Sequence, residues 1–196
     1  VAATIDGTKT TYTGGAGVDT VTLATGTALT KAIDLGAGDD TLSFAAVAVT
    51  GSSAVLNGSD GIDTLSMNAA RAVAVGGATQ TFYTNFERLL INDNGAGTVN
   101  LANLGFTNYV TTSGSTGSLV LNNLANNGTV VLTAAATTDV TVGIKDADTG
   151  ATDVLNAVLS ITGIGGNSLS TAPLGPFIVF VYIWLPYMIL PMQAAL

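Results

Sequence analysis

The chain of 196 residues contains no cysteine and no histidine. Without cysteine there is no disulfide framework and no thiolate chemistry. Without histidine there is no imidazole to act as a general base or to bind zinc. The sequence also lacks the G-x-S-x-G, H-E-x-x-H and G-x-x-x-x-G-K-[ST] motifs of hydrolases, metalloproteases and nucleotide-binding proteins. We therefore expect that the chain is not an enzyme.

Charged residues are also scarce, at 9% of the chain. Five lysines and arginines face thirteen acidic residues, and the net charge is −8. So few cations argue against a nucleic-acid partner on electrostatic grounds, and we expect none. The remaining composition is rich in Gly, Ala, Val, Thr, Leu and Asn, which favours all-β structure with many tight turns. The chain opens "VAATIDGT", without Met or a leader-like segment, which suggests a fragment of a longer protein.

Three segments of nine positions each, in the first third of the chain, resemble one another. They are "GGAGVDTVT" (residues 14–22), "LGAGDDTLS" (35–43) and "GSDGIDTLS" (58–66). Each has Gly at its fourth position, Asp at its sixth, Thr at its seventh and an aliphatic residue at its eighth. The sixth-position aspartates, Asp19, Asp40 and Asp63, follow one another at nearly equal intervals. Recurrence at such a period is typical of a solenoid.

The period continues after residue 67, although the motif does not. The segments "VNL", "LVL" and "VTV", which begin at Val99, Leu119 and Val140, recur with almost the same spacing as the aspartates. A second series, Val110 and Val131, is offset by about half a period. We therefore expect an all-β, right-handed parallel β-solenoid (a β-roll or β-helix) with coils of about 20–23 residues. A β-sandwich with regularly spaced turns is the alternative.

The shared motif has the chemistry of a cation-binding corner. Glycines permit positive φ angles and bring backbone carbonyls close together. Hard cations take six to eight oxygen ligands, readily mixing carboxylates with carbonyls. One corner cannot supply so many oxygens, whereas two stacked corners can, and a shared ion would then link successive coils.

The three segments resemble the nonapeptide G-G-x-G-x-D-x-U-x of the RTX (repeats-in-toxin) family, whose β-rolls bind Ca²⁺. Residues 14–22 match it fully; Leu35 replaces the first glycine of the second copy, and Ser59 the second glycine of the third. The resemblance implies calcium as the cofactor. Its ligands would be Asp19, Asp40 and Asp63, with backbone carbonyls near Gly15, Gly17, Gly36, Gly38 and Gly61, and with Asp39 and Asp60 as secondary candidates.

The spacing of the motifs departs from that of the family, in which nonapeptides follow one another directly. One motif in each coil indicates one calcium-binding edge and one metal-free edge. Three corners would then make two sites, between Asp19 and Asp40 and between Asp40 and Asp63. Asp39 occupies the variable fifth position, so we expect it to face solvent or to support the ligands. "NGAGTVNL" (residues 94–101) resembles a decayed fourth corner with Val99 in place of the aspartate, where the edge should stop.

We divide the chain into RTX-like calcium-binding coils (1–83), looser solenoid repeats (84–170) and an apolar tail (171–196). Within residues 68–93, "NFERLLI" is either one helical turn or the start of a strand, and the segment either covers the end of a first stack or joins two stacks. The body after about residue 84 resembles the strand repeats of bacterial surface-layer proteins and RTX-like adhesins. This resemblance implies a secreted structural protein at the bacterial cell surface that self-associates in a lattice or within a longer chain. The alternative is a non-catalytic repeat domain of a secreted hydrolase or toxin.

The tail differs in composition from the rest of the chain. It reads "PLGPFIVFVYIWLPYMILPMQAAL", holds all four prolines, and carries no charge between residues 174 and 196. Its length is sufficient to span a bilayer, so any membrane contact is expected at 174–196. Prolines within it would kink a helix, and no Lys or Arg flanks it. A membrane anchor, a buried capping strand and a sequence foreign to the natural protein remain three interpretations.

Overall fold

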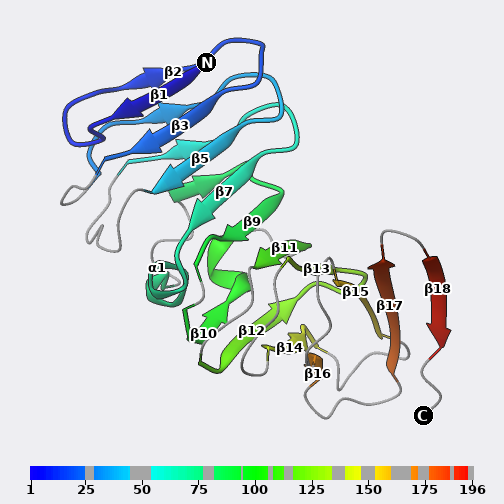
Figure 1. The fold of residues 1–196 in the computed structure, drawn as a ribbon. Helices are drawn as coiled ribbons and strands as arrows, with labels where there is room; N and C mark the ends of the chain where they lie inside the picture. Colours follow the sequence, from blue (N-terminus) through cyan, green and yellow to red (C-terminus); the bar gives the residue numbers. More distant parts are fainter. Residues whose placement is uncertain are drawn as a thin grey trace.

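A computed structural model describes residues 1–24, 29–44, 54–76, 82–93, 95–105, 108–112, 117–133, 140–146 and 153–159, together with the backbone of 169–171, 177–185 and 188–193. Within these residues the structure consists mostly of short strands (Figure 1). The first and the last of the described strands lie at opposite ends of the stack (Figure 1).

One long sheet runs through the whole described structure. Its ten described strands, in spatial order, are β1 (Ala2–Ile5), β3 (Thr20–Leu23), β5 (Thr41–Phe44), β7 (Thr64–Met67), β9 (Arg88–Ile91), β11 (Tyr109–Thr112), β13 (Thr129–Leu132), β15 (Asp153–Leu159), β17 (Phe177–Leu185) and β18 (Met188–Gln193). All neighbours pair in parallel except β17 and β18, which are antiparallel.

Two shorter sheets of four described strands each complete the coils. The first contains β2 (Tyr12–Thr13), β4 (Ile33–Asp34), β6 (Leu56–Asn57) and β8 (Tyr83–Thr84). The second contains β10 (Gly97–Asn100), β12 (Leu119–Leu124), β14 (Val140–Ile144) and β16 (Leu169–Thr171). Both are parallel, and their strands alternate along the chain with strands of the long sheet. The parallel β-solenoid is therefore confirmed.

The strand register shows how the sequence period becomes a coil. Val21 pairs with Leu42, and Leu42 pairs with Leu65, so equivalent positions of the three motifs lie side by side. These three side chains are fully buried, whereas Thr22 and Ser43, which follow the first two, lie at intermediate depth. Each aliphatic side chain of this kind contributes about 1.5–3 kcal/mol when fully buried. The alternation of strands such as "TVTL" and "TLSF" therefore supplies an internal column of the core.

The two offset series of apolar segments in the second half lie on two different faces of the same coils. Val99, Leu121 and Val142 form one column in the β10–β16 sheet. Val110 lies in the long sheet and pairs with Val130, so the prediction of Val131 as its counterpart was wrong by one position. Coil length also varies more than expected. Val130 pairs with Ala157, a longer step along the chain than either step between the aspartates, so the predicted coil length fails where the chain carries insertions.

A short helix marks the place where the second face of the solenoid changes. Helix α1 (Ala69–Ala74) begins after Asn68, whose side chain accepts a hydrogen bond from the Arg71 backbone N–H at 2.9 Å. It follows β7, and it lies next to β10, where the second four-stranded sheet begins (Figure 1). The long sheet continues from β7 to β9, so "NFERLLI" contains a strand, and the described parts of residues 68–93 join two stacks rather than end the first.

The described part of the second half includes the 3-10 helix η2 (Leu101–Leu104), directly after β10. In the tail, the backbone of β17 pairs in parallel with β15 along seven positions, and β18 folds back on β17. This is the backbone arrangement that the capping interpretation of the tail expects. Among the described residues, no helix has the length and apolarity needed to cross a membrane.

Candidate metal centre

Three aspartates stand in a row at one edge of the solenoid. Asp19, Asp40 and Asp63 each immediately precede a strand of the long sheet (β3, β5 and β7). Their exposed fractions are 3%, 1% and 0%. The strand register places the threonines that follow them directly beside one another. The three residues predicted from the motif are therefore neighbours in successive coils.

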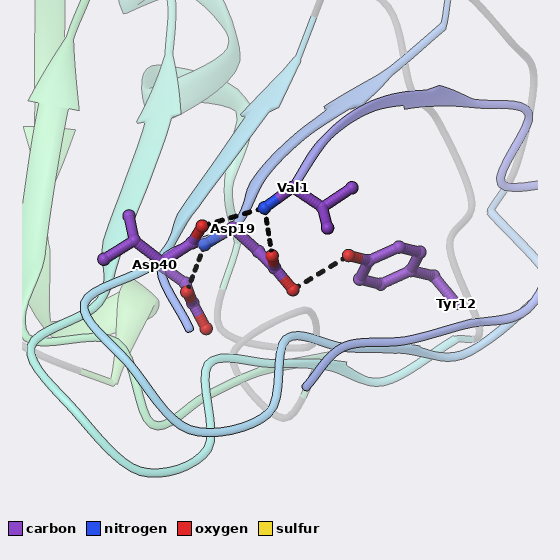
Figure 2. Close-up of polar contacts among 5 residues, drawn as sticks. Val1, Tyr12, Asp19 and Asp40 are labelled. Atoms are coloured by element: carbon purple, nitrogen blue, oxygen red, sulfur yellow. Dashed lines mark hydrogen bonds and ion pairs between the residues drawn. The ribbon is translucent and has the colours of Figure 1, made fainter. Parts of the chain in front are cut away.

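A ladder of hydrogen bonds connects these carboxylates to the backbone of the preceding coil. Asp40 Oδ1 accepts the N–H of Asp19 at 2.7 Å, as Figure 2 shows. Asp63 Oδ1 accepts the N–H of Asp40 at 2.8 Å, and Glu87 Oε2 accepts the N–H of Asp63 at 2.7 Å. Hydrogen bonds to a charged acceptor are about twice as strong as neutral ones, so the row fastens each coil to the next.

Glu87 is the fourth member of the row, and sequence reasoning missed it. It precedes β9 and follows Asp63 at nearly the interval that separates the aspartates, so the period alone could have identified it. The prediction that residues 94–101 form the decayed fourth corner was wrong. Val99 lies in β10 and pairs with Leu121 in a different sheet, away from the aspartate edge.

The first aspartate has partners for both of its oxygens. Asp19 Oδ1 forms an ion pair with the Val1 ammonium group at 2.6 Å, and Oδ2 accepts a hydrogen bond from the Tyr12 hydroxyl at 2.9 Å (Figure 2). These two contacts, the ammonium group first, lower the pKa of Asp19. The motif gave no indication of either partner.

The second and third aspartates each keep one oxygen without a partner. Oδ2 of Asp40 and Oδ2 of Asp63 are buried and form no hydrogen bond within the described structure. Burial raises the pKa of Asp63 to about 6; the N–H of Asp40 opposes this, and the charges of Asp40, Glu87 and Asp39 add to it. A buried carboxylate oxygen without a partner costs free energy, which a proton or a cation would recover.

The glycine corners stack through direct backbone contacts. The carbonyl of Gly15 accepts the N–H of Ala37 at 2.7 Å, and that of Gly36 accepts the N–H of Asp60 at 3.2 Å. Gly38 donates its N–H to the Asp60 carbonyl at 2.8 Å. The carbonyls predicted as ligands at Gly15 and Gly36 therefore already receive a hydrogen bond from the neighbouring corner, although a carbonyl oxygen has a second lone pair.

The carbonyls of Gly17 and Gly38 also lie against the next corner of the stack. The Gly17 carbonyl is close to Gly38, and the Gly38 carbonyl is close to Gly61.

The two secondary candidates lie outside the row. Asp39 and Asp60 are exposed, and Asp39 Oδ1 accepts the N–H of Ile62 at 3.0 Å. Asp39 therefore supports the neighbouring corner from the solvent side, as its variable position suggests.

Unpartnered buried carboxylate oxygens, the donors that a hard cation takes, are found at two of the three aspartates. Asp40 and Asp63, in adjacent coils, each have one buried carboxylate oxygen without a partner, and glycine carbonyls lie along the same edge. At Asp19, Oδ2 is already engaged by the Tyr12 hydroxyl. Among the described residues, no three acidic side chains converge on one point, so carbonyls or water would have to complete an ion's coordination shell.

Comparisons with known proteins assign no family to this chain. No family model matches it, and no solved structure matches it. A stretch of 47 residues, 24% of the chain, is 60% identical to part of the inner membrane ABC transporter permease protein YdcU of Escherichia coli (strain K12). The chain spans 15% of the length of that protein, so the likeness covers a small part of either chain.

The raised pKa of Asp63 predicts an unusual pH dependence in metal-free buffer. Its folded pKa, about 6, exceeds the ordinary value of 3.8. The stabilisation that this carboxyl contributes is therefore complete below about pH 4 and is lost as the pH rises through about 6. Relative to Asp63→Asn, the wild type should lose on the order of 2 kcal/mol over this interval. Urea unfolding at several pH values measures the difference, and parallel profiles for the two proteins would contradict it.

Proposed function

We propose that this chain is a calcium-stabilised structural repeat region of a secreted bacterial surface-layer or adhesin protein. The observation that carries the proposal is the pair of buried, unpartnered oxygens on Asp40 and Asp63, which belong to adjacent coils within stacked Gly-x-Asp corners. Calcium bound at this step takes its side-chain ligands from these two aspartates. Of the two expected sites, we propose this one as the favoured site.

Electrostatics supports a cation at this place. Neighbouring strands lie about 4.8 Å apart, so successive carboxylates of the row are close to one another. Two like charges about 5 Å apart repel by about 3 kcal/mol at an effective dielectric constant of about 20. A divalent cation between them converts this repulsion into attraction. Because the two ligands belong to different coils, binding stabilises the folded stack over the unfolded chain.

The setting of the site supports an extracellular structural role. Extracellular calcium modules bind with dissociation constants of about 10⁻⁴–10⁻³ M, which lets the ion concentration outside the cell control folding. The solenoid presents repeated edges and faces, and in such stacks each coil contacts only its neighbours. We propose self-association in a lattice or within a longer chain as its use. Membrane contact is proposed only for residues 174–196, because this uncharged run is long enough to span a bilayer.

Thermal unfolding of the full chain, followed by circular dichroism, tests the calcium proposal. At about a hundred times the dissociation constant, calcium should add about 2.7 kcal/mol to the unfolding free energy. For a chain of this size, that raises Tm by roughly 5–10 °C. Magnesium at the same concentration should raise it less, because Mg²⁺ demands a tighter octahedral shell.

Variants identify the ligands. Asp40→Asn and Asp63→Asn should each remove most of the calcium-dependent rise in Tm. Asp39→Asn is the matched control, since this neighbouring aspartate is exposed, and its calcium response should remain that of the wild type. Identical Tm values in EGTA and in calcium raised to about 0.1 M, a hundred times the weakest expected dissociation constant, would overturn the proposal. Equal losses from Asp19→Asn, Asp40→Asn and Asp63→Asn would contradict the assignment to a single step.

A further inference from the structure

A buried arginine lies near the opposite end of the strands from the aspartate row. Arg71, in helix α1, is only 4% exposed. Its guanidinium carbon lies 3.6 Å from the centre of the Phe44 ring, at the end of β5. Its Nη2 donates a hydrogen bond to the Tyr83 hydroxyl, in β8, at 3.2 Å. Three separate elements of the first stack therefore surround one positive charge.

The guanidinium group is left with unused donors. Nε and Nη1 of Arg71 are buried and have no hydrogen-bond partner in the described structure. The ion pairs within that part of the chain join Val1 to Asp19 and Lys9 to Asp6, and neither includes Arg71. An arginine side chain stays protonated in proteins, so this charge cannot be removed by loss of a proton. The Phe44 ring and one hydroxyl offset only part of the cost of burying it.

Arg88 provides a comparison within the same chain. Its guanidinium carbon lies 4.9 Å from the centre of the Tyr109 ring, a similar contact with an aromatic face. Arg88 is exposed, however, so water satisfies its remaining donors. Burial without an anionic partner therefore distinguishes Arg71 from an arginine that merely packs on a ring.

We propose that Arg71 binds a small monovalent anion, of the chemical class of chloride, through Nε–H and Nη1–H. The anion supplies the missing negative charge and accepts the donors that no side chain accepts. It must be small because the group is almost completely buried, which excludes large organic anions. Phe44 and Tyr83 hold the guanidinium plane in position. This anion site is independent of the proposed calcium site and goes beyond the proposed function.

The test compares anions at constant ionic strength. The Tm of the full chain is measured in sodium gluconate while chloride replaces gluconate, at a total of about 0.15 M so that screening stays constant. The wild type should show a saturable rise in Tm of about 3 °C or more as chloride increases. Arg71→Gln should lose this rise, whereas Arg88→Gln should keep it. The series is repeated in EGTA and in calcium gluconate, so its result does not depend on the calcium site.

Crystals of the wild type grown in sodium bromide give a second measurement that needs no variant. An anomalous peak within hydrogen-bond distance of Nε or Nη1 of Arg71 is expected. An ordered water molecule at this position in high bromide would overturn the proposal. A chloride response of equal size in the wild type and in Arg71→Gln would also overturn it.

Discussion

Replacing Asp40 by alanine is expected to lower the free energy of unfolding by about 2 kcal/mol in metal-free buffer. The reason is the hydrogen bond from the Asp19 N–H to Asp40 Oδ1, at 2.7 Å. Without its acceptor, this buried N–H has no partner in the described structure, and an unsatisfied buried donor costs about 1–3 kcal/mol. Relief of the repulsion between Asp40 and Asp63 returns part of this cost. Urea unfolding followed by circular dichroism measures the net change.

Asparagine at the same position separates the two contributions. Asp40→Asn keeps an oxygen that can accept the Asp19 N–H and removes the negative charge. In metal-free buffer it should therefore be at least as stable as the wild type, although it should lose the calcium response. Equal destabilisation by Asp40→Ala and Asp40→Asn would show that the hydrogen bond is not what stabilises this corner.

Replacing Gly61 by alanine is expected to destabilise the protein by about 3 kcal/mol or more. Gly61 has φ +147°, which side chains rarely adopt. A Cβ atom there would also overlap the carbonyl oxygen of Gly38 in the preceding corner. Because this neighbour is backbone, it cannot turn aside, and the two corners would have to separate. Thermal unfolding should show a large fall in Tm and a weaker response to calcium.

Gly17 is the matched control, because it occupies the same fourth position of the motif. A Cβ atom on Gly17 would meet nothing within 4 Å. Gly17→Ala should therefore change stability by no more than about 0.5 kcal/mol, as for an exposed substitution. Gly17 also lacks the positive φ of Gly61, so if Gly17→Ala were as costly as Gly61→Ala, neither the positive φ nor the contact with Gly38 would explain the cost.

The solenoid was predictable because equivalent residues of successive coils recur at a nearly constant spacing in the sequence. The Asp-Thr-aliphatic run recurs at Asp19, Asp40 and Asp63, and a parallel stack is the structure in which equivalent residues of equal spacing become neighbours. The two offset series of apolar segments likewise correspond to the two faces of the coil. The row of buried aspartates could be placed at one edge for the same reason.

Insertions limited the prediction. The step from β7 to β9 includes α1 and lacks the motif, so Glu87 was not recognised as the fourth carboxylate. The sequence also did not show that the second face of the solenoid is formed by one four-stranded sheet before α1 and by the other after it. Short apolar segments have the same pattern on either face. Val99 was placed on the wrong edge as a result.

The sequence by itself determined the parallel stack, the period of its first coils and the placing of three aspartates in successive coils, since each follows from spacing along the chain. Only the tertiary structure decided what each polar atom meets. It gave Asp19 two partners, left one oxygen of Asp40 and one of Asp63 without any, and buried Arg71 against Phe44. The physical reason is that hydrogen-bond partners come from neighbouring coils, at distances set by register and insertions, so no motif within one coil can specify them.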